Sequence, residues 1–257
     1  MKPLIMKFGG STVEGSKSFL KIAKRIAIQK GQTERIVVVV SAMKNMTDQL
    51  IQLAKNVHPN PPEREQDMLI SVGERISSSL LAMALKKNNI EAISFTGSQS
   101  GIITCPQHSE AKIIGVRPYR IESELSKGKI VIVAGFQGVS LDREITTLGR
   151  GGADTSAVAL GAALGSERVE FYKDVGAIFT SDPHKDPHAV RLGTLSYSQA
   201  IEIAQGGGIL HPRCISLAEK NKIALHVLSV DEKRGTQIGN GTRSEAPMYE
   251  LSEEELG

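Results

Sequence analysis

Short apolar runs alternate with amphipathic stretches along most of the chain. Six runs predict strands: LIMKF, RIVVVVSA, AISFTG, KIVIVAGFQG, VEFYKD and ALHVLSV. Several of them are apolar throughout, which is typical of parallel strands with both faces covered by helices. The pattern therefore predicts an α/β fold, a three-layer α/β/α sandwich around a central, mainly parallel sheet.

Three stretches between these runs have helical spacing. The first follows the opening strand, with Ser16 or Ser18 placed to cap its start and Gly31 placed to end it. The second is expected over residues 63–87, after the turn-forming HPNPPE, and the third over residues 154–165. The first unit of the fold is therefore strand, helix, strand.

The composition is that of a globular protein. Of 257 residues, 40% are hydrophobic and 23% are charged, so the disorder signature of low hydrophobicity with high net charge is missing. The sequence shows neither an internal repeat nor a long linker. We expect one folded catalytic domain over residues 1–240 and a disordered acidic tail over residues 241–257.

Charge and cysteine content argue against several classes of protein. Lys plus Arg number 31 against 28 Asp plus Glu, and the basic residues are scattered, which disfavours nucleic-acid binding. Cys105 and Cys214 lack CxxC spacing, so neither a disulfide framework nor a structural zinc site is supported. No leader sequence or long apolar segment is evident, and we expect a cytoplasmic protein without a membrane span.

A lysine interrupts the first apolar run, just before the chain breaks into two glycines. A buried ammonium costs several kcal/mol unless an anion compensates it, and no acidic residue stands beside Lys7 in the sequence. Gly9 and Gly10 allow backbone N–H groups to approach a ligand, and Ser11 or Thr12 adds a hydroxyl donor. The segment suits a phosphate, although an ordinary turn with a snorkelling lysine would have the same pattern.

A second glycine-rich segment, TTLGRGGADTSA, follows the predicted strand KIVIVAGFQG. It places Arg150 in a turn and Asp154 at the N-cap of the third helix. An arginine offers a planar fork to a carboxylate, and an aspartate can orient a lysine or a magnesium ion. A capped helix with a surface arginine is the plainer interpretation.

Glu74 follows a glycine in the second predicted helix. A glycine inside a helix costs roughly 1 kcal/mol relative to alanine, so Gly73 indicates close approach of a ligand or of another backbone. A substrate ammonium beside Glu74 would explain both residues, whereas a solvated glutamate would explain only one.

Several familiar nucleotide motifs are missing. The sequence contains no G-x-x-x-x-G-K-[ST], no G-x-G-x-x-G after a strand, and neither H-R-D nor D-F-G. Walker-type NTPases and protein kinases are therefore excluded. The six histidines are dispersed, and Pro187 between His184 and His188 argues against a helical metal pair.

The motifs KFGGST, VVVVSAM, SVGERIS, TTLGRGGADTSA and FTSDP occur in the order found in aspartate kinases of the amino acid kinase family. The resemblance extends from Pro3 to about Ile238. It implies phosphoryl transfer from MgATP to the β-carboxylate of L-aspartate, the entry to lysine, threonine and methionine synthesis. It also implies a homo-oligomer, expected as a homodimer, with the amino acid bound by the N-terminal part and the nucleotide by the C-terminal part.

The resemblance implies a role for each matching residue. Lys7 would stabilise charge on the transferring phosphoryl group, and Asp154 would organise Lys7 and the magnesium phosphates. The phosphate and ATP site would comprise Lys7, Gly9, Gly10, Ser11, Lys173, Asp174, Phe179, Asp182 and His184. The amino-acid site would comprise Ser41, Thr47, Glu74, Arg150 and Gly151. No cluster of protein residues dedicated to a metal ion is expected.

The sequence departs from the usual pattern of aspartate kinases near the expected nucleotide site. Ala177, Phe179, His184 and Gly208 stand where glycine, tyrosine, arginine and, in some members, lysine are common. We expect weaker nucleotide affinity or a changed base preference. The chain also ends soon after the kinase-like region, where many members continue into ACT domains, so no internal feedback inhibition is expected. A truncated sequence or a separate regulatory subunit would give the same ending.

Two other functions fit the same residues. One is a different member of the family that acts on another acid or on a nucleoside monophosphate. The other is a catalytically weak sensor of nucleotide or amino acid. The reaction itself needs no general base, because a substrate carboxylate is already ionised at neutral pH.

Overall fold

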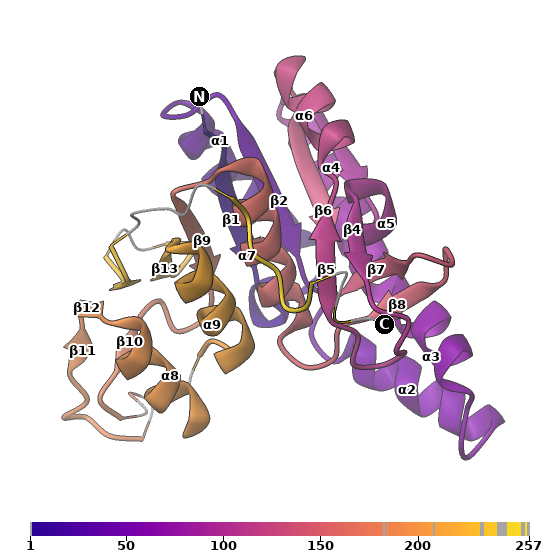
Figure 1. The fold of residues 1–257 in the computed structure, drawn as a ribbon. Coiled ribbons are helices and arrows are strands. Elements are labelled where there is room, and N and C mark those ends of the chain that lie inside the picture. Colours follow the sequence, from indigo (N-terminus) through magenta and orange to yellow (C-terminus); the bar gives the residue numbers. More distant parts are fainter. Residues whose placement is uncertain are drawn as a thin grey trace.

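The computed structural model describes residues 2–181, 183, 185–207, 209–231, 234–240, 246–252 and 255. Its main sheet contains eight strands in the order β12-β14-β13-β9-β1-β2-β6-β3 (Figure 1). In that order their bounds are Thr194–Leu195, Thr236–Ile238, Ala224–Leu228, Arg168–Tyr172, Leu4–Phe8, Ile36–Val40, Ile130–Ala134 and Ala92–Phe95.

The six predicted strands form the continuous parallel part of this sheet. From β13 through β9, β1, β2 and β6 to β3, every neighbouring pair is parallel. Only β14 runs antiparallel to its neighbour β13, and β12 is parallel to β14. The predicted α/β class and its mainly parallel sheet are therefore confirmed.

Helices cover both faces of the sheet, which gives the predicted three layers (Figure 1). The helices and one 3₁₀ turn are η1 Gly10–Thr12, α1 Gly15–Lys30, α2 Met46–Val57, α3 Glu63–Ile70, α4 Val72–Lys87, α5 Gly97–Ser100, α6 Tyr119–Ser126, α7 Gly152–Leu164, α8 Tyr197–Gln205 and α9 Pro212–Asn221. α1 and α4 pack on one face, and α6, α7 and α9 pack on the other.

The alternation of side chains along β1 divides the two cores. Leu4, Met6 and Phe8 point into the core beneath α1 and α4, whereas Ile5 belongs to the core beneath α7 and α9. Lys7 stands two residues after Ile5 and therefore projects to the α7 face. The period of the strand thus carries the lysine towards the start of α7.

The helix boundaries differ from the sequence predictions in three places. α1 begins at Gly15 without a side-chain cap, and Ser18 Oγ instead accepts from the Glu14 amide and donates to the Gly15 carbonyl. The helix expected over residues 63–87 is divided at Ser71 into α3 and α4. The N-cap of α7 is Gly151, so Asp154 lies inside the first turn.

Two smaller sheets were not predicted. One has the order β5-β4-β7-β8, and the other pairs β10 with β11. Their bounds are β4 Ile102–Thr104, β5 Ile113–Val116, β7 Gln137–Ser140, β8 Ile145–Thr147, β10 Ile178–Phe179 and β11 Arg191–Leu192. These strands have two to four residues, too few to establish a clear alternation in the sequence.

One helical stretch within the described residues, Glu63–Lys87, is long and apolar enough to cross a membrane by length and composition, with a hydropathy of 1.3. No such segment was expected from the sequence. Half of its most apolar part is buried inside the protein. The stretch corresponds to α3 and α4, and α4 packs on the sheet. A helix that covers a protein core gives the same signal.

Residues 246–252 of the acidic tail contact the folded domain. Met248 exchanges hydrogen bonds of 2.8 Å with the side chain of Asn221 in α9. The amide of Glu250 donates to the carbonyl of Ile113 in β5 at 3.0 Å. This segment therefore hydrogen-bonds to two elements of the folded domain.

Adjacent leucines in α4 test the packing of this layer. Leu81 is fully buried in the core beneath α1 and α4, whereas Leu80 is 37% exposed. We expect Leu81→Ala to lower the free energy of unfolding by about 3 kcal/mol, because the cavity adds to the lost transfer energy. Leu80→Ala should cost under about 1 kcal/mol. Urea unfolding of both variants measures the difference, and equal losses would contradict the assignment of the buried face.

Candidate active site

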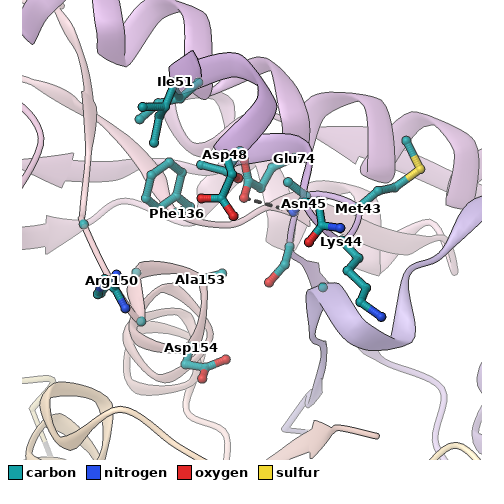
Figure 2. Close-up of a pocket in the computed structure, with 18 of the residues that line it drawn as sticks. Met43, Lys44, Asn45, Asp48, Ile51, Glu74, Phe136, Arg150, Ala153 and Asp154 are labelled. Carbon is teal, nitrogen blue, oxygen red and sulfur yellow. Dashed lines mark hydrogen bonds between the residues drawn. The ribbon is translucent and has the colours of Figure 1, made fainter. Parts of the chain in front are cut away.

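A cavity of about 680 Å³ opens at the carboxyl ends of β1 and β2 (Figure 2). The first turns of α2 and α7 also line it, through Thr47 and Asp154. Carboxyl ends of parallel strands are where open α/β sheets bind ligands, and helix N-termini favour anions. The site therefore has the position and the polarity of a phosphate-binding site.

Two buried charged groups, Lys7 and Asp154, line the floor of this cavity, and a third, Lys173, pairs with Asp154. Lys7 forms an ion pair with Oδ1 of Asp154, and Lys173 Nζ lies 2.9 Å from Oδ2 of the same carboxylate. The Lys7 and Asp154 side chains are only 4% and 7% exposed. The anion that Lys7 requires is thus supplied within the protein by a residue 147 positions later in the sequence.

The cluster of Lys7, Asp154 and Lys173 carries one excess positive charge. Burial lowers the pKa of Lys7 to about 8. Burial opposes ionisation of Asp154, but Lys7 and Lys173 outweigh it and lower the pKa of Asp154 to about 2. Burial also opposes ionisation of Lys173, yet Asp154 raises its pKa above the usual value. Two ammonium groups that share one carboxylate leave a site that attracts a further anion.

Cys214 lies near this cluster and is fully buried. Burial raises the pKa of its thiol well above the usual value, so the group stays neutral and adds no charge. Cys214 and Cys105 are both free.

The residues of the glycine segment after β1 make different contacts, and only some of them line the cavity. The amide of Gly9 donates to the carbonyl of Tyr172 in β9, so it serves the sheet and not a ligand. Thr12 Oγ1 donates to the Gly9 carbonyl at 2.7 Å. Gly10 and Ser11 line the cavity, and a Cβ at Gly10 would lie 3.2 Å from the carbonyl oxygen of Ala42. Of the two hydroxyls considered, Ser11 is therefore the one placed for a ligand.

Glu74 lies on the wall of the cavity in the first turn of α4. Its Oε1 accepts a 2.9 Å hydrogen bond from the Ala42 amide, and its Oε2 is buried without a hydrogen-bond partner among the described residues (Figure 2). Burial raises the pKa of Glu74 to about 7. A cationic group bound against Oε2 would compensate this buried carboxylate.

Gly73 allows the approach of a protein loop. A Cβ at this position would lie 2.8 Å from the Cβ of Ala42 and 3.6 Å from Met46. Of the two explanations offered by the sequence, close approach of another backbone segment is therefore the one that the structure shows. The approach brings the Ala42 amide to Glu74.

Arg150 enters the cavity on a loop with two left-handed glycines. Gly149 and Gly151 have φ of 70° and 72°, which non-glycine residues rarely adopt. A Cβ at Gly151 would lie 2.3 Å from the Cβ of His211, just before α9. The loop therefore requires glycine for both its conformation and its packing.

Most of the predicted residues meet in this one cavity. Its lining includes Lys7, Gly10, Ser11, Ser41, Thr47, Glu74, Arg150, Gly151 and Asp154. Sequence reasoning missed Asp48 and Phe136, which face the same space (Figure 2). The only feature of the sequence that could have indicated Asp48 is its position one residue after Thr47, which was expected at the substrate.

The residues expected at the nucleotide are more dispersed. Lys173 reaches Asp154, and with Asp174 it also lines a second hollow beside Ser11. Phe179 lies in the short strand β10. Asp182 and His184 lie outside the described residues, as does Gly208.

Among the described residues, no group of three or more His, Cys, Asp or Glu could hold a metal ion. Mg²⁺ is commonly bound through one or two carboxylates together with substrate phosphates and water. Asp154 and Asp48 are carboxylates on the wall of the cavity, so the donor set fits a magnesium ion that arrives with a nucleotide.

Nearly the whole chain is similar in sequence to known proteins. An aspartokinase of Mycolicibacterium smegmatis is 47% identical over 251 residues, covering 96% of this chain and 59% of that protein. An aspartokinase of Bacillus sp. (strain MGA3) is 46% identical over 237 residues, covering 91% and 58%. The chain thus spans about three fifths of the length of the curated relatives it matches.

Solved structures agree in fold. The aspartate kinase from Synechocystis superposes with a TM-score of 0.83 at 40% identity, covering 96% of this chain and 41% of that one. The UMP kinase from Bacillus anthracis has a TM-score of 0.66 at 20% identity, covering 96% and 98%, which shows a common fold alone. The model of the amino acid kinase family matches residues 2–229, and the chain therefore belongs to the amino acid kinase family.

Proposed function

We propose that this chain transfers the terminal phosphoryl group of ATP to the side-chain carboxylate of L-aspartate, giving 4-phospho-L-aspartate and ADP. The observation that carries the proposal is the polarity of one cavity. Lys7 and Asp154 of the cationic cluster line its floor, with Lys173 paired to Asp154. Glu74 and Arg150 line its walls. The relatives named aspartokinase support this choice of substrate.

Glu74 and Arg150 suit the two ends of an α-amino acid. The buried Oε2 of Glu74 has no hydrogen-bond partner in the part of the chain that the structure describes, and it would accept from the substrate ammonium. The guanidinium of Arg150 would hold the α-carboxylate through a two-pronged hydrogen bond. A nucleoside monophosphate has no ammonium for Glu74, and this favours the amino acid.

The cationic cluster suits the phosphoryl group. Asp154 fixes Lys7 and Lys173 through opposite oxygens, so neither ammonium can rotate away without losing an ion pair. Their excess charge would stabilise the oxygens of the transferring group, which gain negative charge in the transition state. The attacking carboxylate is already ionised, so the side chains need only position and neutralise it.

Asp154 and Asp48 are the carboxylates that would face a magnesium ion bound with the nucleotide, and such an ion would supply neutralisation of part of the phosphate charge. Asp154 is the buried carboxylate on the floor of the cavity. It would hold Lys7 and Lys173 in place beside the phosphates that bind the ion. Asp48 is the second carboxylate on the wall.

We assign the amino acid to the N-terminal part of the chain and to the loop of Arg150, and the nucleotide to the C-terminal part. Lys173 and Asp174 support the second assignment because they follow β9 beside Ser11. We place the activity in the cytoplasm, in amino-acid biosynthesis, which agrees with two free buried cysteines.

The role of Lys7 can be tested by Lys7→Ala. We expect kcat to fall by about 100- to 1,000-fold with little change in KM, because a charge-stabilising donor is lost. Asp154 keeps Lys173 as a partner, so the fold should survive. Lys24→Ala, which removes an exposed lysine of α1, is the matched control. Steady-state kinetics that give Lys7→Ala a kcat within a few fold of wild type would remove Lys7 from the reaction.

The buried Glu74 predicts a pH dependence. Its pKa of about 7 leaves it mostly protonated at pH 6 and ionised at pH 8, and only the ionised form attracts an ammonium. The KM for aspartate should therefore fall by about tenfold from pH 6 to pH 8. Glu74→Gln should have a high KM with no such slope.

Arg150→Ala is the control for this experiment. It should also raise the KM for aspartate, but the slope with pH should remain because Glu74 is intact. An unchanged slope in Glu74→Gln would show that another group titrates.

The substrate assignment is tested by turnover. Wild-type protein with MgATP and hydroxylamine should form a hydroxamate from L-aspartate, and none from L-glutamate or UMP, with ADP release measured in parallel. Binding of ATP and aspartate without hydroxamate would indicate a sensor. Faster ADP release with another acceptor would indicate a different enzyme of the family.

A further inference from the structure

The loop that carries Arg150, residues 148–151, depends on contacts outside itself. It joins β8 to α7, and two of its four residues are glycines in the left-handed region. Glycine-rich segments have high conformational freedom, so a fixed direction for Arg150 requires partners on neighbouring elements.

One side of this loop is held by α3. Asp67 is fully buried, and its carboxylate accepts from the amide of Thr147 at 3.0 Å and from its hydroxyl at 2.5 Å. The same carboxylate accepts from the amide of Ser109 and lies 2.8 Å from Nδ1 of His108. The last residue of β8, from which the loop starts, is therefore fixed from the N-terminal half of the chain.

The other side is held by Arg213 in the first turn of α9. Its Nη1 donates to the carbonyl of Leu148, two residues before Arg150, and its Nη2 donates to the carbonyl of Ala111 at 2.5 Å. Neither Arg213 nor Ala111 lines the cavity. Arg213 thus contacts the loop from outside the site.

The C-terminal segment, residues 246–252, holds Arg213 in place through Glu250. Both oxygens of Glu250 pair with Arg213, one with Nε and the other with Nη2 at 2.7 Å. Oε2 of Glu250 also accepts from the Ile113 amide at 2.9 Å. The side chains of Arg213 and Glu250 are 14% and 8% exposed, so either charge would be costly to leave alone. A two-pronged pair also fixes the plane of the guanidinium, and with it the direction of the bond to Leu148.

We propose that Arg213 and Glu250 are positioning residues for the aspartate site, which act through Leu148 on Arg150. The C-terminal segment then contributes to aspartate binding, although none of its described residues lines the cavity. The proposal rests on the proposed function, in which Arg150 binds the α-carboxylate of the substrate.

The contacts that hold the C-terminal segment on the domain differ from those that position the Arg150 loop. Met248 and Asn221 hold the segment on α9 through two hydrogen bonds of 2.8 Å, and the main chain of Glu250 bonds to Ile113. None of these contacts involves the side chain of Glu250. Truncating that side chain should therefore release the loop without detaching the segment.

The test compares Glu250→Ala with Glu255→Ala. Glu255 is a glutamate of the same tail whose described hydrogen bonds are to Ser252, so it is the matched control. In Glu250→Ala we expect the KM for aspartate to rise about tenfold, since a small misplacement of a binding group weakens it strongly, while kcat and the KM for ATP stay within about twofold. Arg213→Lys keeps the charge but loses the fork and should behave in the same way.

Hydrogen exchange gives a readout that does not depend on turnover. The amides of residues 148–153 should exchange faster in Glu250→Ala than in wild type or in Glu255→Ala, while those of β1 and β2 stay unchanged. An unchanged KM for aspartate, or a joint loss of kcat, ATP affinity and thermal stability, would overturn the positioning role. A wild-type chain that does not phosphorylate aspartate would overturn the proposed function alone. Exchange would then decide whether Glu250 holds the loop, and unchanged exchange would overturn that claim as well.

Discussion

The whole site depends on one carboxylate shared by two ammonium groups in a buried place. Asp154 makes it possible for Lys7 to stand inside an otherwise apolar strand, and it fixes Lys173, which follows the neighbouring strand β9. Because a single negative charge faces two positive ones, the cluster keeps an attraction for one more anion. In the proposed function, the three side chains that balance one another's charge inside the protein would also bind the phosphate.

The fold explains how these groups meet. The alternation of β1 turns Lys7 towards α7, and the left-handed Gly151 begins that helix so that Asp154 falls in its first turn. The loop after β2 approaches α4 over Gly73, and this contact buries Glu74 against the Ala42 amide. Binding groups of opposite charge are therefore fixed to different layers around one cavity, and the Arg150 loop is held from both halves of the chain.

The sequence was informative where physical signals are local. Continuous apolar runs predicted all six strands of the parallel sheet, and Lys7 was recognisable as a cation that needs an anion. The partner of Lys7 was not recognisable from spacing, because Asp154 stands 147 positions later and only the family resemblance connected the two residues. The short strands β4, β5, β7 and β8 lack a readable period. Asp67, Arg213 and Glu250 look like ordinary surface charges in the sequence, since their contacts are all formed by tertiary structure.

The central claim is that the excess charge of the Lys7, Asp154 and Lys173 cluster exists for the terminal phosphate of a nucleotide. The most direct measurement is a crystal structure of the protein with L-aspartate and a non-hydrolysable ATP analogue. The claim predicts Lys7 Nζ within hydrogen-bond distance of the terminal phosphate, which would also lie near the substrate side-chain carboxylate. Phosphates bound elsewhere, with Lys7 in contact with Asp154 alone, would contradict it.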